Sequence, residues 1–539
     1  MSTLHTLNEI AHGTIHGDGD LEVRDIGLDS KALPDGALFA ALPGTRVHGA
    51  QFAADTPAAA AILTDAQGVE ILRAAGESRP VIEVADIRAV LGHVAAEIYG
   101  HPTDKLTVVG VTGTSGKTTT SYLVEAGLLA AGKSVGLIGT TGTRINREPV
   151  PTTLTTPEAP TLQALFARMV SEGVTHVVME VSSHALELGR VAGTRFAVGG
   201  FTNLSQDHLD FHPTMEEYFW AKARLFGGKQ GAEHAVCCID DDWGQRMAEV
   251  ARDAGHTPVI VGTSAKVRDA KAPGRVYAHQ KDVDATGAQD VALAIGDDAY
   301  ELHLPLPGEF NIANAALAVG MATCLDGVEL TEFLRGIENV AVPGRMERVD
   351  RGQDFIAVVD YAHKPAAIEA VLQTLRGQLK ASPHPGGGIA IVVGAGGDRD
   401  STKRPLMGAA AAAADFVVVT DDNPRTEDPA PIRQAVAEGA RKALRADDRA
   451  TEVEVVDVDS RARAIDVAVD WVGTGDAVIV VGKGHEVGQI VGTETIHFDD
   501  REELARAVEE KLSGRGHADS AGGDTIVHEN SCATEKEQQ

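Results

Sequence analysis

Residues 109–120, VGVTGTSGKTTT, decide which fold this chain can adopt. An apolar run enters a glycine-rich turn, and a helical pattern begins at Thr118. This order of strand, glycine loop, Lys-Thr and helix is typical of a phosphate-binding loop. In such a loop, backbone N–H groups face a polyphosphate, Lys117 would neutralise charge, and the Thr118 hydroxyl could hold Mg²⁺.

The loop departs from the usual pattern at its first glycine, because Val111 stands where a glycine is expected. The nearest glycines, Gly110 and Gly113, leave a variant that runs Gly-Thr-x-Gly-Lys-Thr. A Gly/Ser turn with a chance lysine is the alternative interpretation. The flanking strand and helix favour the phosphate-binding loop, since the motif requires both.

The length and charge of the chain restrict its class. A chain of 539 residues is too long for one hydrophobic core, so several domains are expected. The 48 Lys and Arg against 78 Asp and Glu give a net charge of −30. This argues against a nucleic-acid-binding protein, which needs a basic face. An anionic substrate must therefore be held by a few placed cations.

The cysteines and the N-terminus indicate the cytoplasm. The four cysteines are not spaced as metal ligands, and Cys237, Cys238 and Cys324 are expected to be buried, reduced thiols. The N-terminus has no basic region followed by an apolar one, and no apolar run reaches 18 residues. We therefore predict a cytoplasmic monomer that neither binds nucleic acid nor inserts into a membrane.

The pattern of elements predicts an α/β protein of three domains with a disordered tail. The N-terminal α/β domain is expected over residues 1–105, a central P-loop ATPase-like domain with a mainly parallel sheet over 106–342, and a Rossmann-like domain over 343–514. Residues 515–539 would form the tail. Alternating residues around a turn at 296–298 predict a hairpin, and residues 342–345 are predicted to form a hinge.

Polar clusters follow several predicted strands, where parallel sheets bind their ligands. Glu180 ends one strand and could bind Mg²⁺ beside a phosphate loop, although a surface glutamate fits the spacing equally well. Residues 203–212 are rich in His and Asp and indicate either a metal or acid–base site or structural histidines. Zinc is disfavoured because no cysteine accompanies them. A helix is expected over residues 218–226, and Lys222, taken alone, would be a solvated cation on it.

The motifs, in their order along the chain, resemble the Mur ligase family of peptidoglycan synthesis, and most closely its diaminopimelate-adding members. The resemblance extends from about Leu28 to Glu486. The segments that carry it are residues 113–118, 155–158, 180–184, 203–210, 221–226, 311–314, 343–345, 360–365, 397–399, 422–425 and 482–486. Each motif alone is weak, and their common order is what makes the resemblance specific.

The resemblance implies an ATP-dependent amide ligase. ATP would convert a carboxylate of the substrate to an acyl phosphate, an amine would attack it, and phosphate would leave after a tetrahedral intermediate. The implied partners are UDP-N-acetylmuramoyl-L-alanyl-D-glutamate and diaminopimelate, with ATP and two Mg²⁺ ions. The family lysine that matches Lys222 is carbamylated, which turns a cation into an oxygen ligand for Mg²⁺.

The resemblance also implies roles for individual residues. The catalytic residues would be Lys117, Glu180, His208 and Lys222. The metal ligands would be Thr118, Glu180, His208 and the carbamate on Lys222. The nucleotide would be bound by Gly113, Thr114, Ser115, Gly116, Lys117, Thr118, Thr119, Asn311, Arg345, Asp360 and His363. The UDP group would contact Leu28, Ser30, Thr45, Arg46 and Val47. The muramoyl-dipeptide would contact Thr155, Thr156, Ser182 and Arg190. Diaminopimelate would be held by Arg399, Asp422, Asn423, Pro424, Arg425, Gly482 and Glu486.

Arg425 is the residue expected to select diaminopimelate, because its guanidinium could grip the distal carboxylate that lysine lacks. Spacing alone would favour a turn that carries a solvated arginine. The chain also departs from the family pattern, since Leu154 and Leu188 stand where some members have Asn and Gln. Fewer side-chain hydrogen bonds to the peptide are then expected.

Two other functions stay open at this stage. A sister ligase, such as a folylpolyglutamate synthetase, would share the ATP chemistry and use another acceptor, but residues 30–47 and 422–425 argue against it. A phosphate-loop NTPase switch would hydrolyse ATP without forming an amide. The third α/β domain with its own charged clusters fits a switch poorly. The sequence does not distinguish meso- from LL-diaminopimelate.

Overall fold

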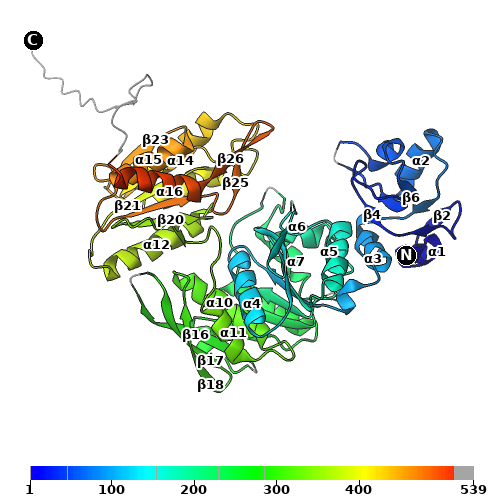
Figure 1. The fold of residues 1–539 in the computed structure, drawn as a ribbon, viewed down its shortest axis with the longest axis horizontal. Helices are drawn as coiled ribbons and strands as arrows, with labels where there is room; N and C mark the ends of the chain where they lie inside the picture. The colour runs from blue at the N-terminus through cyan, green and yellow to red at the C-terminus, as the bar shows by residue number, and fades with distance from the viewer. Residues whose placement is uncertain are drawn as a thin grey trace, which may run out of the picture.

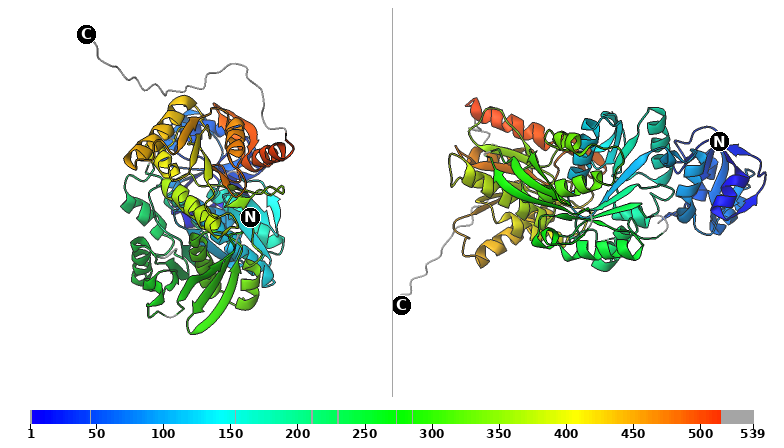
Figure 2. Two further views of the ribbon diagram at one scale, coloured as in Figure 1. Left: turned by 90° about the vertical axis from the view of Figure 1, so that its left-hand side faces the viewer. Right: turned by 90° about the horizontal axis from the view of Figure 1, so that it is seen from below.

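The computed structural model describes residues 2–514 except positions 45, 153, 210, 229, 230, 273 and 285. The predicted tail, residues 515–539, and Thr45 of the expected UDP site lie outside the described residues. Three lobes follow one another along the chain (Figure 1). The central lobe lies between the other two, which are at opposite ends of the molecule (Figure 2).

The N-terminal lobe is built on a five-stranded sheet of order β2-β7-β6-β5-β4. Its strands are β2 (Thr14–His16), β4 (Ile26–Gly27), β5 (Ala37–Ala40), β6 (Ala59–Thr64) and β7 (Val81–Glu83). The helices around it are α1 (Leu4–Ala11), η1 (Gly49–Asp55), α2 (Ala66–Ala74), α3 (Ile87–Ile98) and η2 (Pro102–Asp104), and the short strands β1 (Ser2–Thr3) and β3 (Glu22–Val23) pair separately. Strands β4 to β7 run parallel, so the loops that follow them lie at one edge of the sheet.

The central lobe holds an eleven-stranded sheet of order β11-β10-β9-β12-β8-β13-β14-β15-β16-β17-β18. Seven neighbouring strands run parallel, namely β9 (Val135–Gly139), β12 (His176–Glu180), β8 (Thr107–Thr112), β13 (Val198–Phe201), β14 (His234–Cys238), β15 (Val259–Gly262) and β16 (Val276–Val283). Antiparallel strands extend both edges, namely β10 (Gly142–Ile145), β11 (Glu148–Val150), β17 (Gln289–Ile295) and β18 (Asp298–Leu304). The predicted hairpin with its turn at Gly296 is therefore confirmed.

Helices cover both faces of this sheet, and the alternation of side chains along β8 explains why. Val109 packs into the core on one face, and Val108 packs into the core on the other. The covering helices are α4 (Lys117–Ala130), α5 (Ala159–Ser171), α6 (Ser183–Glu187), α7 (Met215–Ala223), α8 (Asp242–Asp253), α9 (Ala265–Arg268), α10 (Glu309–Ala322) and α11 (Leu330–Ile337). Because β8 is interior to the sheet, the loop that follows it lies inside the carboxyl edge, between the ends of β12 and β13.

The C-terminal lobe contains a six-stranded sheet of order β19-β20-β24-β21-β22-β23, parallel except for β19. Its strands are β19 (Glu347–Arg348), β20 (Ile356–Asp360), β21 (Ile389–Val393), β22 (Phe416–Val419), β23 (Glu454–Asp457) and β24 (Ala477–Val481). The helices are α12 (Pro365–Ala381), α13 (Lys403–Ala411), α14 (Pro429–Ala446), α15 (Arg461–Trp471) and α16 (Asp500–Leu512), and a hairpin joins β25 (Val487–Val491) to β26 (Glu494–Asp499). The predicted α/β class with mainly parallel sheets is confirmed.

Two local expectations, the end of one helix and the burial of Cys324, need correction. The helix expected over 218–226 is α7, which ends at Ala223. Cys237 and Cys238 are buried free thiols as predicted, but Cys324 is only partly buried because it follows the end of α10. Among the described helices, none combines the length and the apolar character that crossing a membrane requires.

A fully buried ion pair joins α15 to α16 in the C-terminal lobe. The Arg461 guanidinium donates to both carboxylate oxygens of Asp500 at 2.7 Å, and also to the carbonyl oxygen of Val481 at 2.9 Å. Both side chains are 0% exposed. Breaking such a pair by removing one partner leaves a buried, uncompensated charge.

We therefore expect Arg461→Leu to destabilise the C-terminal lobe by ~3 kcal/mol or more. Hydrogen exchange of the β24 amides measures this, and their protection should fall by about 100-fold. Arg351→Leu is the control, because its pair with Glu509 in the same lobe is exposed and should contribute under ~1 kcal/mol. Equal protection in the two variants would contradict the expectation.

Candidate active site

The phosphate-binding loop needs both of its glycines for steric reasons. Gly113 has φ +144° and Gly116 has φ +85°, which side chains on L residues rarely adopt. A Cβ on Gly113 would lie 1.8 Å from Oγ1 of Thr202, and one on Gly116 would lie 2.3 Å from Oδ1 of Asn314. The loop is thus packed directly against β13 and α10.

Side chains at the end of β13 hold the loop in place. The Ser115 amide donates to Oδ1 of Asn203 at 3.0 Å, and the Thr202 hydroxyl donates to the Ser115 carbonyl at 2.7 Å. Lys117 Nζ donates to the carbonyl oxygens of Gly113 and Thr114, each at 3.0 Å. Burial and the nearby Lys364 lower the pKa of Lys117 to about 8. The helix N-terminus that follows the loop suits an anionic ligand.

Oxygen atoms that could bind a metal ion lie beside the loop, at the end of β12. The Thr118 hydroxyl donates to Oε1 of Glu180 at 2.9 Å, and Thr140 donates to the same carboxylate through its amide and its hydroxyl. Glu180 is 1% exposed, so the surface-glutamate interpretation is wrong. A hydroxyl with a carboxylate suits Mg²⁺, which commonly takes one or two protein oxygens and completes its shell with phosphates and water.

Within the described residues, three or more His, Cys, Asp or Glu side chains are nowhere grouped as a metal cage. His208, with φ +54°, lies 3.1 Å from Asp207 through its Nε2. Burial lowers the pKa of His208, with Asp207 acting in the opposite direction, and a neutral imidazole is the form that binds metals.

Lys222 on α7 is 1% exposed, so the solvated-cation interpretation is wrong. Its Nζ donates to the Gly113 carbonyl at 2.8 Å and lies 4.4 Å from the centre of the Tyr218 ring. Burial, reinforced by the positive charges of Lys117 and Lys364, lowers the pKa of Lys222 well below its ordinary value. The phosphate loop and Lys222 therefore share one buried site.

The residues expected at the muramoyl-dipeptide are close to Glu180. The Thr156 hydroxyl donates to the Glu180 carbonyl at 2.9 Å and accepts from the Ser182 amide at 3.2 Å. Oγ1 of Thr155 lies 3.3 Å from Oγ1 of Thr140. Arg190 reaches the Thr156 carbonyl at 3.4 Å.

Arg345 links the C-terminal lobe to the phosphate loop. Its Nη2 donates to the Thr118 hydroxyl at 3.1 Å, and its guanidinium lies 4.3 Å from the centre of the Tyr361 ring. The Tyr361 ring in turn contacts that of His363 at 4.8 Å between centroids. The structure thus brings Arg345 and His363 to the junction between the lobes.

Asp360 and Asn311 form hydrogen bonds with nearby backbone groups. The Asp360 carboxylate accepts from the amides of Met346 and Ala362, both at 2.7 Å. Burial raises the pKa of Asp360, and Arg345 opposes that shift. The Asn311 amide donates to the Pro307 carbonyl at 2.8 Å.

The loops after β22 and β24 form one network around Asn423. Its Oδ1 accepts from Nζ of Lys483 at 2.9 Å and from the Ile490 amide at 3.0 Å, and its Nδ2 donates to Glu486 at 3.2 Å. Lys483 also lies 3.6 Å from Asp422. The predicted acceptor residues of these two loops are therefore in contact.

The segment Pro424–Arg425 continues this network. Arg425 has φ +52°, its amide donates to the Ile490 carbonyl at 3.0 Å, and its Nη1 donates to the Gly397 carbonyl at 2.7 Å. A Cβ on Gly397 would lie 1.9 Å from the Pro424 carbonyl oxygen, and one on Gly482 would lie 2.8 Å from Asp422. Arg399 is exposed beside this loop.

Three charged residues were missed by the sequence prediction. Lys483 is 0% exposed inside the acceptor network, and Lys364 pairs with Asp207 at 2.7 Å between the lobes. All three lie inside motifs that had been recognised, residues 482–486, 360–365 and 203–210. Spacing could not separate them from solvated charges.

The expected UDP residues lie at the carboxyl edge of the N-terminal sheet. Leu28 and Ser30 follow β4, whereas Arg46 and Val47 follow β5, its parallel neighbour. Leu28 and Ser30 are half-buried and Arg46 and Val47 are exposed. The two loops are therefore adjacent.

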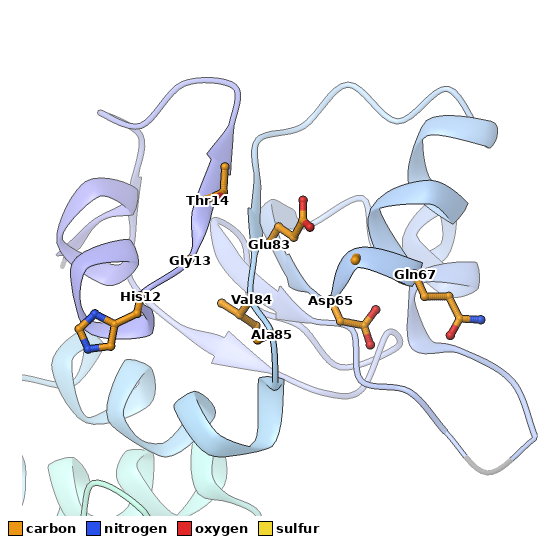
Figure 3. Close-up of a pocket in the computed structure, with 9 residues that line it drawn as sticks. His12, Gly13, Thr14, Asp65, Gln67, Glu83, Val84 and Ala85 are labelled. Carbon is orange, nitrogen blue, oxygen red and sulfur yellow. The ribbon is translucent and has the colours of Figure 1, made fainter.

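The N-terminal lobe also contains a pocket of about 470 Å³ (Figure 3). It lies between β2, β7 and the start of α2, and Glu83 and Asp65 contribute its carboxylates (Figure 3). Glu83 is paired with His16 at 2.7 Å, and Asp65 caps α2 by accepting from the Gly68 amide at 2.8 Å. The nine lining residues include none of the expected UDP residues, so this pocket is separate from the loops after β4 and β5 where UDP is expected to bind.

Three sequence profiles match the chain in order. They are "Mur ligase family, catalytic domain" over residues 22–99, "Mur ligase middle domain" over 111–322 and "Mur ligase, glutamate ligase domain" over 344–484. Together they include the phosphate loop, Lys222, Arg345 and residues 422–425, whereas Glu486 lies two residues beyond the last profile.

Whole-chain relatives agree with the profiles. A Corynebacterium glutamicum protein named UDP-N-acetylmuramoyl-L-alanyl-D-glutamate--2,6-diaminopimelate ligase is 57% identical over 507 residues, which cover 93% of this chain and 94% of that protein. A protein of the same name from Streptomyces coelicolor is 45% identical, covering 92% and 94%.

Solved structures give the same answer for the fold. A structure of a ligase with that name aligns with a TM-score of 0.63 and 28% identity, covering 95% of this chain and 99% of its own. Mycobacterium tuberculosis folylpolyglutamate synthase, complexed with ADP and AMPPCP, aligns at 0.57 with 19% identity, covering 79% and 95%, and so shares the fold. On the profiles and the whole-chain identities, this chain belongs to the Mur ligase family.

Proposed function

We propose that the chain is an ATP-dependent ligase that adds diaminopimelate to the D-glutamate of UDP-N-acetylmuramoyl-L-alanyl-D-glutamate, in cytoplasmic peptidoglycan precursor synthesis. The observation that carries this proposal is the 57% identity with a relative of that name over 93% of the chain. The geometry supports it, because a phosphate loop and a set of acceptor loops belong to neighbouring lobes. Arg345 spans the junction between them.

The first step is a phosphoryl transfer. An oxygen of the D-glutamate carboxylate bonds to the terminal phosphorus of ATP, the bond from that phosphorus to the bridging oxygen breaks, and ADP leaves with the electron pair. Such a step needs positioning and charge neutralisation from the protein. The loop amides and Lys117 would hold the phosphates, while Thr118, Glu180 and His208 would hold Mg²⁺, which supplies charge neutralisation when bound.

The second step forms the amide. The amine nitrogen of diaminopimelate bonds to the acyl carbon and loses a proton, and phosphate leaves with the electron pair of the C–O bond. The network of Asn423, Lys483 and Glu486 would hold the amino acid near the junction. Glu486 would accept from its distal ammonium, and Arg425 would bind its distal carboxylate.

Carbamylation of Lys222 is part of the proposal. A neutral amine is required to attack carbon dioxide, and burial lowers the pKa of Lys222 well below its ordinary value. The modified side chain would present a carboxylate to a second Mg²⁺ beside Gly113. We further propose three domains over residues 1–105, 106–342 and 343–514, a hinge at 342–345, and a monomeric enzyme.

Product mass spectrometry tests the function. The chain is incubated with ATP, Mg²⁺ and UDP-N-acetylmuramoyl-L-alanyl-D-glutamate, and meso-diaminopimelate, LL-diaminopimelate and lysine compete as acceptors. We expect ADP, phosphate and the diaminopimelate amide in equal amounts. ATP hydrolysis without an amide would support an NTPase switch. In a parallel reaction with a folate and glutamate in place of these substrates, formation of the glutamyl amide would support the sister ligase.

Arg425→Ala is expected to lose most diaminopimelate ligation and to reduce the preference for diaminopimelate over lysine. An unpaired carboxylate in a partly dry pocket costs ~2 kcal/mol or more, so kcat/KM should fall by about 30-fold. Competition between the two amino acids measures the preference. Arg441→Ala, at an exposed position on α14, is the matched control. Unchanged preference in Arg425→Ala would refute this role.

A further inference from the structure

Three lysine ammonium groups converge on two carbonyl oxygens of the phosphate loop. Lys117 donates to Gly113 and Thr114, Lys222 donates to Gly113 at 2.8 Å, and Lys364 donates to Thr114 at 3.4 Å. Lys117 and Lys222 come from the central lobe, whereas Lys364 comes from the C-terminal lobe. Lys364 is thus the one member of this trio that crosses the junction.

Lys364 is held firmly where it crosses. It directly precedes α12, its side chain is 11% exposed, and its Nζ lies 2.7 Å from Oδ2 of Asp207. Asp207 follows β13 and is itself 12% exposed. This ion pair joins the two lobes and fixes the direction of the Lys364 ammonium toward Thr114.

Because Lys222 is proposed to be carbamylated, Lys117 and Lys364 are the two ammonium groups of this trio that remain at the loop. Asp207 is the carboxylate that contacts Lys364, and the carboxylate of Glu180 is directed at Thr118 and Thr140. Like charges that are buried together repel strongly, and buried charges are normally compensated. Two ammonium groups, one from each lobe, beside the helix N-terminus that follows the loop therefore suit an anionic ligand.

We propose that Lys364 is a further catalytic residue, which the C-terminal lobe delivers to the terminal phosphoryl group of the bound nucleoside triphosphate. This inference rests on the proposed function and deepens it. Lys117 would neutralise the phosphates from the loop, and Lys364 would do so from the opposite lobe. The ammonium donates hydrogen bonds throughout and transfers no proton, and Asp207 positions it.

This arrangement would make catalysis depend on the contact between the lobes. A cation supplied from a second structural unit stabilises the charge of phosphoryl transfer only when that unit is in place. The phosphoryl group would then move only after the acceptor loops had closed on the same site, which limits loss of the acyl phosphate to water.

The test compares Lys364→Met, Lys364→Arg and Lys380→Met in the full chain. Lys380 is exposed near the end of α12, the helix that Lys364 precedes, which makes it the matched control. We expect Lys364→Met to reduce kcat by about 100-fold, as loss of one placed donor typically does. Lys364→Arg should recover at least about a tenth of the wild-type rate because it keeps the charge.

Binding of AMPPCP and of ADP distinguishes a contact of Lys364 with the terminal phosphoryl group from a purely structural role. Lys364→Met should weaken AMPPCP by about tenfold or more while ADP binding stays within about twofold, because ADP lacks the terminal group. Equal loss for both nucleotides, or turnover within about threefold of wild type, would overturn the proposal. If wild type itself forms no amide with the UDP substrate, the proposed function fails instead, and the two failures are distinguishable.

Discussion

Lys117→Ala is expected to abolish ligation while the fold stays intact. Lys117 is half-buried at the phosphate loop, where a placed cation offsets the charge that moves during phosphoryl transfer. Removal of one such group typically costs ~3–4 kcal/mol of transition-state stabilisation, or about 10²–10³ in kcat. Steady-state release of ADP with the UDP substrate and diaminopimelate measures the loss.

The control for this variant is Lys266→Ala, which removes an exposed lysine from the same lobe. It should keep the wild-type rate, because its pair with Asp242 is solvated. Circular dichroism and the melting temperature of Lys117→Ala should match those of wild type. Near-normal turnover in Lys117→Ala would rule out the assignment of the phosphate loop.

Lys222→Ala is expected to be almost inactive, with activity partly restored by a short carboxylic acid. The truncation opens space beside the Gly113 carbonyl, and acetate or formate could place a carboxylate there in place of the carbamate. We expect a loss of about 100-fold or more, since the variant removes an electrostatic group from the reacting centre. Initial rates with increasing acetate measure the rescue.

Lys117→Ala is the control for the rescue, because it truncates a neighbouring lysine whose role is cationic. Acetate should leave that variant inactive, whereas methylamine could help it. If Lys222→Ala keeps the wild-type rate and Mg²⁺ dependence, the carbamate role is wrong. Rescue of both variants by acetate would indicate a non-specific salt effect.

Buried strands were predictable because their side chains are apolar on both faces. The sequence contains nearly continuous apolar runs at residues 389–393 and 477–481, which coincide with β21 and β24, and one at 355–360, which begins one residue before β20. The hairpin of β25 and β26 escaped prediction. Its residues are mostly exposed or half-buried, so no continuous apolar run marks it.

The site was predictable where a residue's place in a motif fixes its backbone neighbours, as at Gly113 and Lys117. It was not predictable where the burial of a long charged side chain depends on tertiary packing. Lysine is usually a surface residue, so spacing alone placed Lys222 in solvent and only the family resemblance assigned it to the site. Lys364 was missed, and tertiary packing places it at the phosphate loop. Asp360 illustrates the reverse case, because its position was predicted, whereas its hydrogen bonds to two backbone amides were not.

The acceptor network and the phosphate loop are carried by different sheets that share no strand. A substitution at Arg425 or Asn423 would therefore reshape the proposed amino-acid pocket without moving β8 or Gly113. Phosphorylation of the substrate carboxylate and selection of the incoming amino acid could then change independently. A lineage could acquire a new cross-linking amino acid by changing one sheet's loops, and an inhibitor aimed at the phosphate loop would stay effective after such a change.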